Sequence, residues 1–175
     1  MIDEQLKATI RDVPDFPKPG IVFKDITPIL KDPKLCEAIL TNLIMRLAVD
    51  SFDVIAGIES RGFLFGLMLA QRLGKPFVPI RKQGKLPYSA MQQEYKLEYG
   101  SATIEIHEDA FMPGARVLIH DDLLATGGTV AATSQLIQKL GGSVAGYAFI
   151  ITLDFLNGKE RLLSYSPNVV SLVGY

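Results

Sequence analysis

Apolar and polar residues alternate along the chain in blocks that predict strands and helices in turn. Helical spacing of apolar residues begins at Pro33, runs over 62–74 and recurs over Thr129–Leu140. Apolar runs of strand length stand between and beyond these helices, at 52–59, 76–81, 116–119, 144–155 and 169–175. This order is typical of an α/β protein whose mostly parallel, twisted sheet is flanked by helices on both faces.

Two segments break the alternation. Residues 3–12 have the apolar spacing of a short amphipathic helix, and four prolines and a glycine then hold residues 14–30 in an extended backbone. Residues 82–107 begin with turn residues and continue with two alternating patterns, which predict an antiparallel hairpin. We therefore expect one domain over residues 1–175, with an N-terminal hood at 1–32 and a flexible flap at 82–107.

Composition and charge narrow the classes of function. The 175 residues are 48% hydrophobic, and 18 basic residues against 19 acidic ones give a net charge of -1. A nucleic-acid-binding protein usually has a clear basic excess, so we expect no nucleic-acid partner. The single cysteine allows no intrachain disulfide, and no apolar run is long enough to cross a bilayer. We therefore expect a cytoplasmic protein without a membrane partner.

Two adjacent acids and a glycine-bearing turn follow the apolar run at 117–119. Charged carboxylates as close as those of Asp121 and Asp122 need hydroxyls, a cation or water beside them. Ligands bind beyond the carboxyl ends of parallel strands, and a helix N-terminus with bare glycine backbone suits a phosphate. The stretch therefore predicts a sugar-phosphate site, with ribose hydroxyls on the two acids and a phosphate on Ala125, Thr126, Gly127, Gly128 and Thr129. The two threonines add hydroxyl donors and possible helix caps; the alternative is an acidic strand end before an ordinary cap.

The same stretch, VLIHDDLLATGGT from Val117 to Thr129, resembles the phosphoribosyl-pyrophosphate signature of type I phosphoribosyltransferases. The sequence DDLLATGGT within this stretch is similar to that of the adenine phosphoribosyltransferases within this family. His120 stands where a small aliphatic residue is more usual, and we interpret it as a structural variation. The resemblance implies the type I phosphoribosyltransferase fold and phosphoribosyl pyrophosphate as a substrate.

A second stretch, SRGFLFG, begins at Ser60 and resembles the pyrophosphate loop of the family. Arg61 offers a permanently charged, forked donor to an oxyanion, and Ser60 can cap the following helix. An arginine at a strand end is more often a surface charge when it stands alone. The resemblance implies that Ser60 and Arg61 bind pyrophosphate and that the peptide bond between Glu59 and Ser60 is cis.

Two stretches of the flap region extend the resemblance. RKQGKLP clusters Arg81, Lys82 and Lys85, which alone would indicate a solvated turn and by resemblance close over pyrophosphate. LEYG contributes Glu98 and Tyr99, which the residue types alone would assign to an exposed strand. The resemblance implies that Glu98 is the general acid/base at the purine and that Tyr99 closes over the ribosyl centre.

The stretch FPKPGIVFKDITP, which begins at Phe16, resembles the purine-binding hood of the family. An extended backbone can read the hydrogen-bonding edge of a base, and Phe23 can stack on its face. The resemblance implies that the backbone groups of Val22 and Lys24 contact the base and that Leu123 lies on the face of the base opposite Phe23. At the position of Lys24 the family often has arginine. The alternative is a proline-rich lid that packs Phe16 and Phe23 into the core.

Together these motifs imply a pentosyltransferase of purine salvage that joins adenine to phosphoribosyl pyrophosphate and releases AMP and pyrophosphate. The catalytic candidates are Glu98, Arg61, Asp121 and Asp122. The resemblance also implies a homodimer, and Mg²⁺ held mainly through the substrate with no direct ligand from the chain. The alternatives are a 6-oxopurine phosphoribosyltransferase and a regulator that binds phosphoribosyl pyrophosphate without turning it over. The segment after Thr152 has no diagnostic motif.

Overall fold

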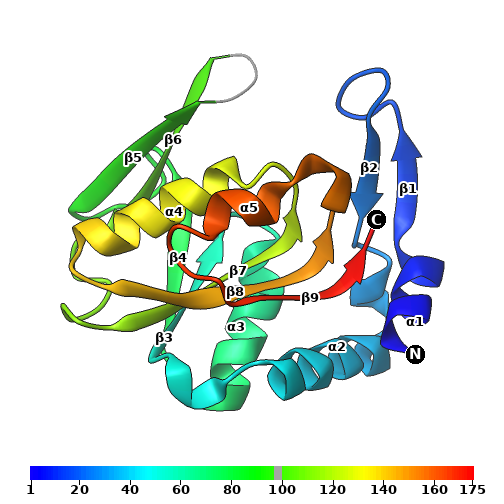
Figure 1. The fold of residues 1–175 in the computed structure, drawn as a ribbon, viewed down its shortest axis with the longest axis horizontal. Helices are drawn as coiled ribbons and strands as arrows, with labels where there is room; N and C mark the ends of the chain where they lie inside the picture. The colour runs from blue at the N-terminus through cyan, green and yellow to red at the C-terminus, as the bar shows by residue number, and fades with distance from the viewer. Residues whose placement is uncertain (97–99) are drawn as a thin grey trace.

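A seven-stranded sheet forms the centre of the computed structural model, which describes residues 1–96 and 100–175 (Figure 1). Its strand order is β5-β6-β4-β3-β7-β8-β9. The bounds are β3 (Val54–Ile58), β4 (Phe77–Lys82), β5 (Ala90–Lys96), β6 (Ser101–His107), β7 (Arg116–Leu124), β8 (Ser143–Thr152) and β9 (Val169–Gly174). The five strands from β4 to β9 pair in parallel, and β6 and β5 extend one edge antiparallel. The predicted mostly parallel α/β sheet is confirmed.

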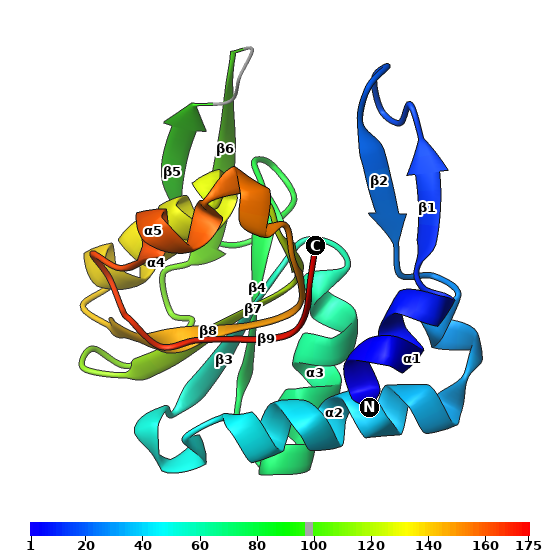
Figure 2. The ribbon, with the colours of Figure 1, turned by 45° about the vertical axis from the view of Figure 1, so that its right-hand side comes forward.

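Helices cover both faces of this sheet (Figure 2). They are α1 (Ile2–Thr9), α2 (Pro33–Arg46), α3 (Gly62–Leu73), α4 (Gly128–Lys139) and α5 (Gly158–Leu162), with 3-10 turns at Ile29–Lys31, Val49–Ser51 and Asp154–Leu156. Because side chains alternate along a strand, Ile55 and Leu118 share a core with the first three helices, whereas Ala56 and Ile119 share one with α4 and α5. In the part of the chain described, no helix is both long and apolar enough to span a membrane.

Capping residues set the ends of two predicted helices. The Asp32 carboxylate accepts hydrogen bonds from the backbone N–H groups of Lys34 and Leu35, and Pro33 occupies the first turn of α2. Gly74 ends α3 with φ of 63°, in the left-handed region that glycine adopts without strain. Both boundaries agree with the sequence.

The predicted N-terminal helix over 3–12 is too long. It ends at Thr9, because Arg11–Pro14 form strand β1 and pair antiparallel with β2 (Val22–Asp25). The backbone N–H of Gly20 donates to the Asp15 carboxylate at 2.7 Å across the hairpin turn. The hood is therefore a two-stranded hairpin that rises beside the main sheet, opposite the flap hairpin of β5 and β6 (Figure 2).

The predicted strand at 116–119 is too short. β7 continues to Leu124 because β8 pairs with it as far as Thr152. Asp121 and Asp122 therefore lie near the carboxyl end of a central strand, and the hydrogen bonds of the sheet hold their backbone. This places the acids on a rigid element and leaves the turn to residues 125–127.

Candidate active site

The carboxyl ends of β3, β4 and β7 surround a cavity of about 300 Å³. Because these strands are neighbours and parallel, the loops that follow them meet at one edge of the sheet. The cavity is lined by Glu59, Ser60, Arg61, Lys82, Asp121, Asp122 and Leu123. Six of these seven are residues that the sequence proposed for pyrophosphate, ribose or base; Glu59 is the addition.

Arg61 joins the acid pair to the hood. Its Nε atom donates to the Oδ2 atom of the buried Asp122 carboxylate at 2.5 Å. Its guanidinium also lies over the ring of Phe23, with Cζ 5.1 Å from the ring centroid. Arg61 is therefore not a solvated surface charge, and it holds the strand end and the hood together.

Asp121 faces a different environment. Burial, followed by the neighbouring charge of Asp122, raises the pKa of the Asp121 carboxyl well above its usual range. Its Oδ1 atom accepts the backbone N–H of Asp122 at 2.8 Å, and no salt bridge reaches it from the described residues. A ligand hydroxyl or a cation at this carboxyl would therefore be favoured.

Glu59 organises the cations near the cavity. Its Oε2 atom accepts the backbone N–H of Lys82 at 2.9 Å and Nε of Arg81 at 3.1 Å. Burial opposes ionisation of Glu59, but these hydrogen bonds outweigh it and hold its pKa below the usual value. The peptide bond from Glu59 to Ser60 is cis, as expected from the resemblance. In the described residues no side chain caps α3, so Ser60 does not do so.

Arg81 and Lys85 are not among the residues that line this cavity. The buried Glu105 stabilises the turn that follows β4. Its carboxylate accepts hydrogen bonds from the backbone N–H groups of Lys85 and Leu86 at 2.9 and 3.0 Å. Sequence reasoning missed Glu105, although a glutamate between Ile104 and Ile106 interrupts an apolar run and was a usable signal.

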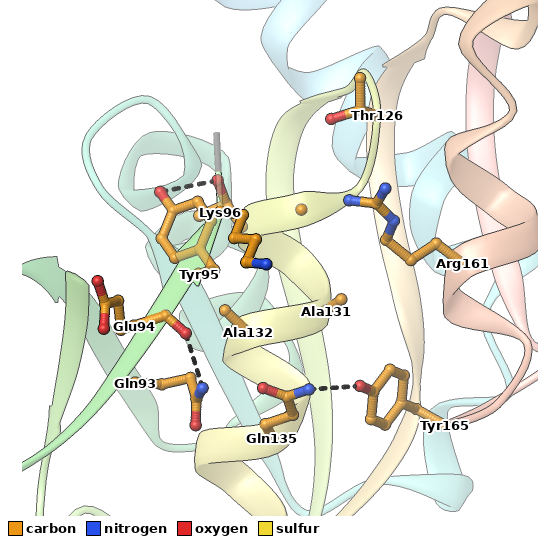
Figure 3. A pocket seen from close by; sticks show the side chains of 12 residues that line it. Gln93, Glu94, Tyr95, Lys96, Thr126, Ala131, Ala132, Gln135, Arg161 and Tyr165 are labelled. Carbon is orange, nitrogen blue, oxygen red and sulfur yellow. Dashed lines mark hydrogen bonds between the residues drawn. The ribbon is translucent and has the colours of Figure 1, made fainter. Parts of the chain in front are cut away.

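The predicted phosphate turn opens onto a second, larger cavity of about 820 Å³ between β5, α4 and α5 (Figure 3). Thr126, Gly128 and Thr129 line it. α4 begins at Gly128, and within the described chain its N-terminus has no side-chain cap, so neither threonine serves as one. The Thr129 hydroxyl instead donates to the Tyr95 hydroxyl of the flap at 3.1 Å. The first-turn N–H groups of α4 are left for a ligand.

The hood presents aromatic side chains rather than burying them. Phe16 is 51% exposed, and its ring meets the half-buried Phe23 edge-on at 5.2 Å. The alternative in which both rings pack into the core is therefore wrong for Phe16. Lys24 binds Asp12 at 2.7 Å, and its ammonium lies 3.8 Å from the ring centroid of Tyr175. Its side chain thus ties the hood to the end of β9.

Known proteins share this architecture. The model of the phosphoribosyl transferase domain matches residues 25–171. The adenine phosphoribosyltransferase of Cytophaga hutchinsonii is 54% identical over 175 residues, which cover 100% of this chain and 97% of that one. The chain belongs to the adenine phosphoribosyltransferase family.

Solved structures of the family have the same fold. The adenine phosphoribosyltransferase of Thermoanaerobacter pseudethanolicus superposes with a TM-score of 0.95 at 50% identity and covers 100% of both chains. That of Saccharomyces cerevisiae, solved with an imino-altritol bisphosphate and adenine, gives a TM-score of 0.91 at 39% identity over 98% of each chain.

Several residues around the larger cavity were not identified from the sequence. Tyr95, Gln135, Arg161 and Tyr165 line it, and the Gln135 amide donates to the Tyr165 hydroxyl at 3.0 Å (Figure 3). None lies in the stretches whose sequence resembles the family. Glu98 and Tyr99, which the family resemblance singled out, lie outside the described residues.

His120 is buried behind the acid pair. Neither ring nitrogen has a hydrogen-bond partner among the described residues, and burial lowers its pKa from 6.5 to about 4. The ring packs against α3 at Gly66, where a Cβ would lie 3.3 Å from Cδ2. In this family member the neutral imidazole fills core space between strand and helix.

We expect His120 to make the stability depend on pH. From pH 6.5 down to about 4 the unfolded chain takes up a proton that the folded chain does not, so the free energy of unfolding falls by about 3 kcal/mol. Above pH 6.5 His120 is neutral in both states, so its contribution to the free energy of unfolding does not change with pH. Denaturant titrations of wild type and His120→Val between pH 4 and 7.5 measure it, because the two proteins differ in no other titratable group. Parallel curves would contradict a neutral, unpartnered imidazole.

Proposed function

We propose that the protein transfers the phosphoribosyl group of phosphoribosyl pyrophosphate to adenine and releases AMP and pyrophosphate. The observation that carries this proposal is the single sheet edge at which β3, β4 and β7 end. There the Arg61–Asp122 pair and Asp121 line one cavity, beside a phosphate-type turn and next to an aromatic hood. The membership of the chain in the adenine phosphoribosyltransferase family supports the choice of base.

Each part of the substrate has a proposed set of contacts. Asp121 and Asp122 hold the ribose hydroxyls, and the turn takes the 5'-phosphate through Ala125, Thr126, Gly127, Gly128 and Thr129. Both acids are supported by the backbone of a central strand, which fixes the sugar relative to its phosphate. A negative carboxylate beside the ring also favours an oxocarbenium-like centre as the bond to pyrophosphate breaks.

Cations of the β3 and β4 loops face the leaving group. Arg61 and Lys82 line the cavity, and Glu59 holds the loop of Arg81 and Lys85 close to it. Pyrophosphate would draw the guanidinium of Arg61 into a new charge-assisted pair. Ser60 adds a hydroxyl donor, and Tyr99 is proposed to close over the ribosyl centre.

The base is proposed to lie in the hood. Val22 and Lys24 would read its edge through backbone groups, with Phe23 on one face and Leu123 on the other. Val22 is 50% exposed at the start of β2. Glu98 would accept the proton that adenine gives up when its ring nitrogen bonds to the anomeric carbon.

Mg²⁺ fits this site as a partner of the substrate. Asp121 offers carboxyl oxygens that form no salt bridge with the described residues, and oxygen donors are what Mg²⁺ prefers. When bound, Mg²⁺ would neutralise the pyrophosphate oxygens, and those oxygens with the ribose hydroxyls would be its main ligands.

We also propose a cytoplasmic homodimer. The exposed side chains of Leu64 and Leu67 on α3 support an association of subunits.

A product assay tests the proposal. Purified protein is incubated with Mg²⁺ and phosphoribosyl pyrophosphate plus adenine, hypoxanthine or guanine, and nucleotides are separated by chromatography. We expect AMP from adenine and no IMP or GMP. IMP or GMP instead would overturn the assignment of the hood, and no nucleotide from any base would point to a regulator.

A further inference from the structure

The proposed 5'-phosphate turn carries no positive charge of its own. Residues 125–129 are all neutral, so a phosphate dianion there would meet only backbone N–H groups and two hydroxyls. Of the cations near the other cavity, Arg61 pairs with Asp122 and Arg81 with Glu59, and Lys82 lines that cavity but not this one. A tightly bound sugar phosphate therefore calls for a further cation on the side of the larger cavity.

Helix α5 is packed directly onto this turn. A Cβ on Gly158, the first residue of α5, would overlap the carbonyl oxygen of Ala125. A Cβ on Gly127 would lie 2.9 Å from the carbonyl oxygen of Gly158. Only glycine permits this approach, and it fixes the start of α5 against the turn although Gly158 and Ala125 are 33 residues apart in sequence.

Arg161 follows Gly158 by three residues and so lies on the same side of α5. Its Nη1 atom is 3.3 Å from the position that a Cβ of Gly128 would occupy, and its guanidinium points toward the turn that carries Thr126 (Figure 3). Neighbouring Lys159 is paired with Asp154 at 2.9 Å. Arg161 has no ion-pair or hydrogen-bond partner anywhere in 1–96 and 100–175.

We propose that Arg161 binds the 5'-phosphate of phosphoribosyl pyrophosphate and of AMP, as the cation that the turn lacks. The inference rests on the proposed function, because it assumes a phosphate at Gly128. A guanidinium matches two phosphate oxygens at once and is always charged, so it adds both affinity and orientation. Gly158 contributes indirectly, because its close approach to Ala125 places α5 near enough for the Arg161 side chain to reach the phosphate turn.

Calorimetric titration with ribose 5-phosphate tests the proposal, since this ligand carries the 5'-phosphate without pyrophosphate or base. In Arg161→Gln we expect the dissociation constant to rise about 10- to 100-fold, and in Arg161→Lys to rise less. The KM for phosphoribosyl pyrophosphate should rise in parallel, while the KM for adenine stays within about twofold. Lys139→Gln removes a charge from the exposed far end of α4 and should change neither value.

The outcomes separate the two hypotheses. Equal affinity of wild type and Arg161→Gln for ribose 5-phosphate overturns the role of Arg161 and leaves the turn intact. Absence of binding by the wild type overturns the phosphate turn, and the role of Arg161 with it. Thermal unfolding of each variant is measured alongside; because Arg161 is exposed and unpartnered in the described chain, we expect unchanged midpoints.

Discussion

Replacement of Gly128 by valine is expected to weaken binding of phosphoribosyl pyrophosphate by at least about 100-fold and to leave the fold intact. A Cβ at Gly128 would meet only side-chain atoms, at 3.3 Å from Arg161, 3.8 Å from Tyr95 and 3.9 Å from Thr126. The valine therefore fits into the open cavity, where it occupies the space in front of the first turn of α4. A phosphate excluded from that turn loses several charge-assisted hydrogen bonds at once.

The neighbouring glycine provides the matched control. Gly127 has φ of 76° and lies against Gly158, so Gly127→Val should lower the unfolding midpoint by several degrees as well as abolish binding. Calorimetric titration with phosphoribosyl pyrophosphate and thermal unfolding distinguish the two variants. Retained affinity in Gly128→Val would show that the phosphate binds away from the N-terminus of α4.

Replacement of Glu98 by glutamine is expected to lower kcat by about 100- to 10,000-fold. Glutamine keeps the shape of the side chain but cannot accept the purine proton, so the loss falls on the chemical step. The dissociation constant for phosphoribosyl pyrophosphate should stay within a few-fold of the wild-type value, because Glu98 is not assigned to that ligand. Steady-state rates and equilibrium titrations together measure both quantities.

Glu108→Gln serves as the control for a lost charge at the flap. Glu108 is exposed and follows β6 at the base of the hairpin. This variant should keep wild-type kcat. If Glu98→Gln keeps it too, Glu98 has no part in proton transfer and another group must take the purine proton.

The sheet and the cavity at the carboxyl ends of β3, β4 and β7 were predictable because their determinants are local. β3 and the run Val117–Ile119 of β7 are apolar and buried, as expected for strands covered on both faces, and each leads into its loop within a few residues. Parallel pairing then brings separate loops together at one edge. The motifs with Arg61, Asp121 and Asp122 needed no long-range information beyond that rule.

The features missed from the sequence depend on contacts between distant residues. Arg11 and Asp12 continue a helical pattern, and only pairing with Lys24 and Asp25 makes them a strand. Arg161 reaches the phosphate turn because Gly158 packs on Ala125, a fit that no local pattern signals. The partner of Arg61 was likewise hidden, since Asp122 is 61 residues away.

A crystal structure of the protein with AMP would show directly how the two cavities and the hood divide the nucleotide between them. We expect the 5'-phosphate on the backbone of residues 126–129, the ribose hydroxyls on Asp121 and Asp122, and the base between Phe23 and Leu123. A phosphate bound beside Lys82, or a base placed in the larger cavity near Tyr165, would contradict this assignment.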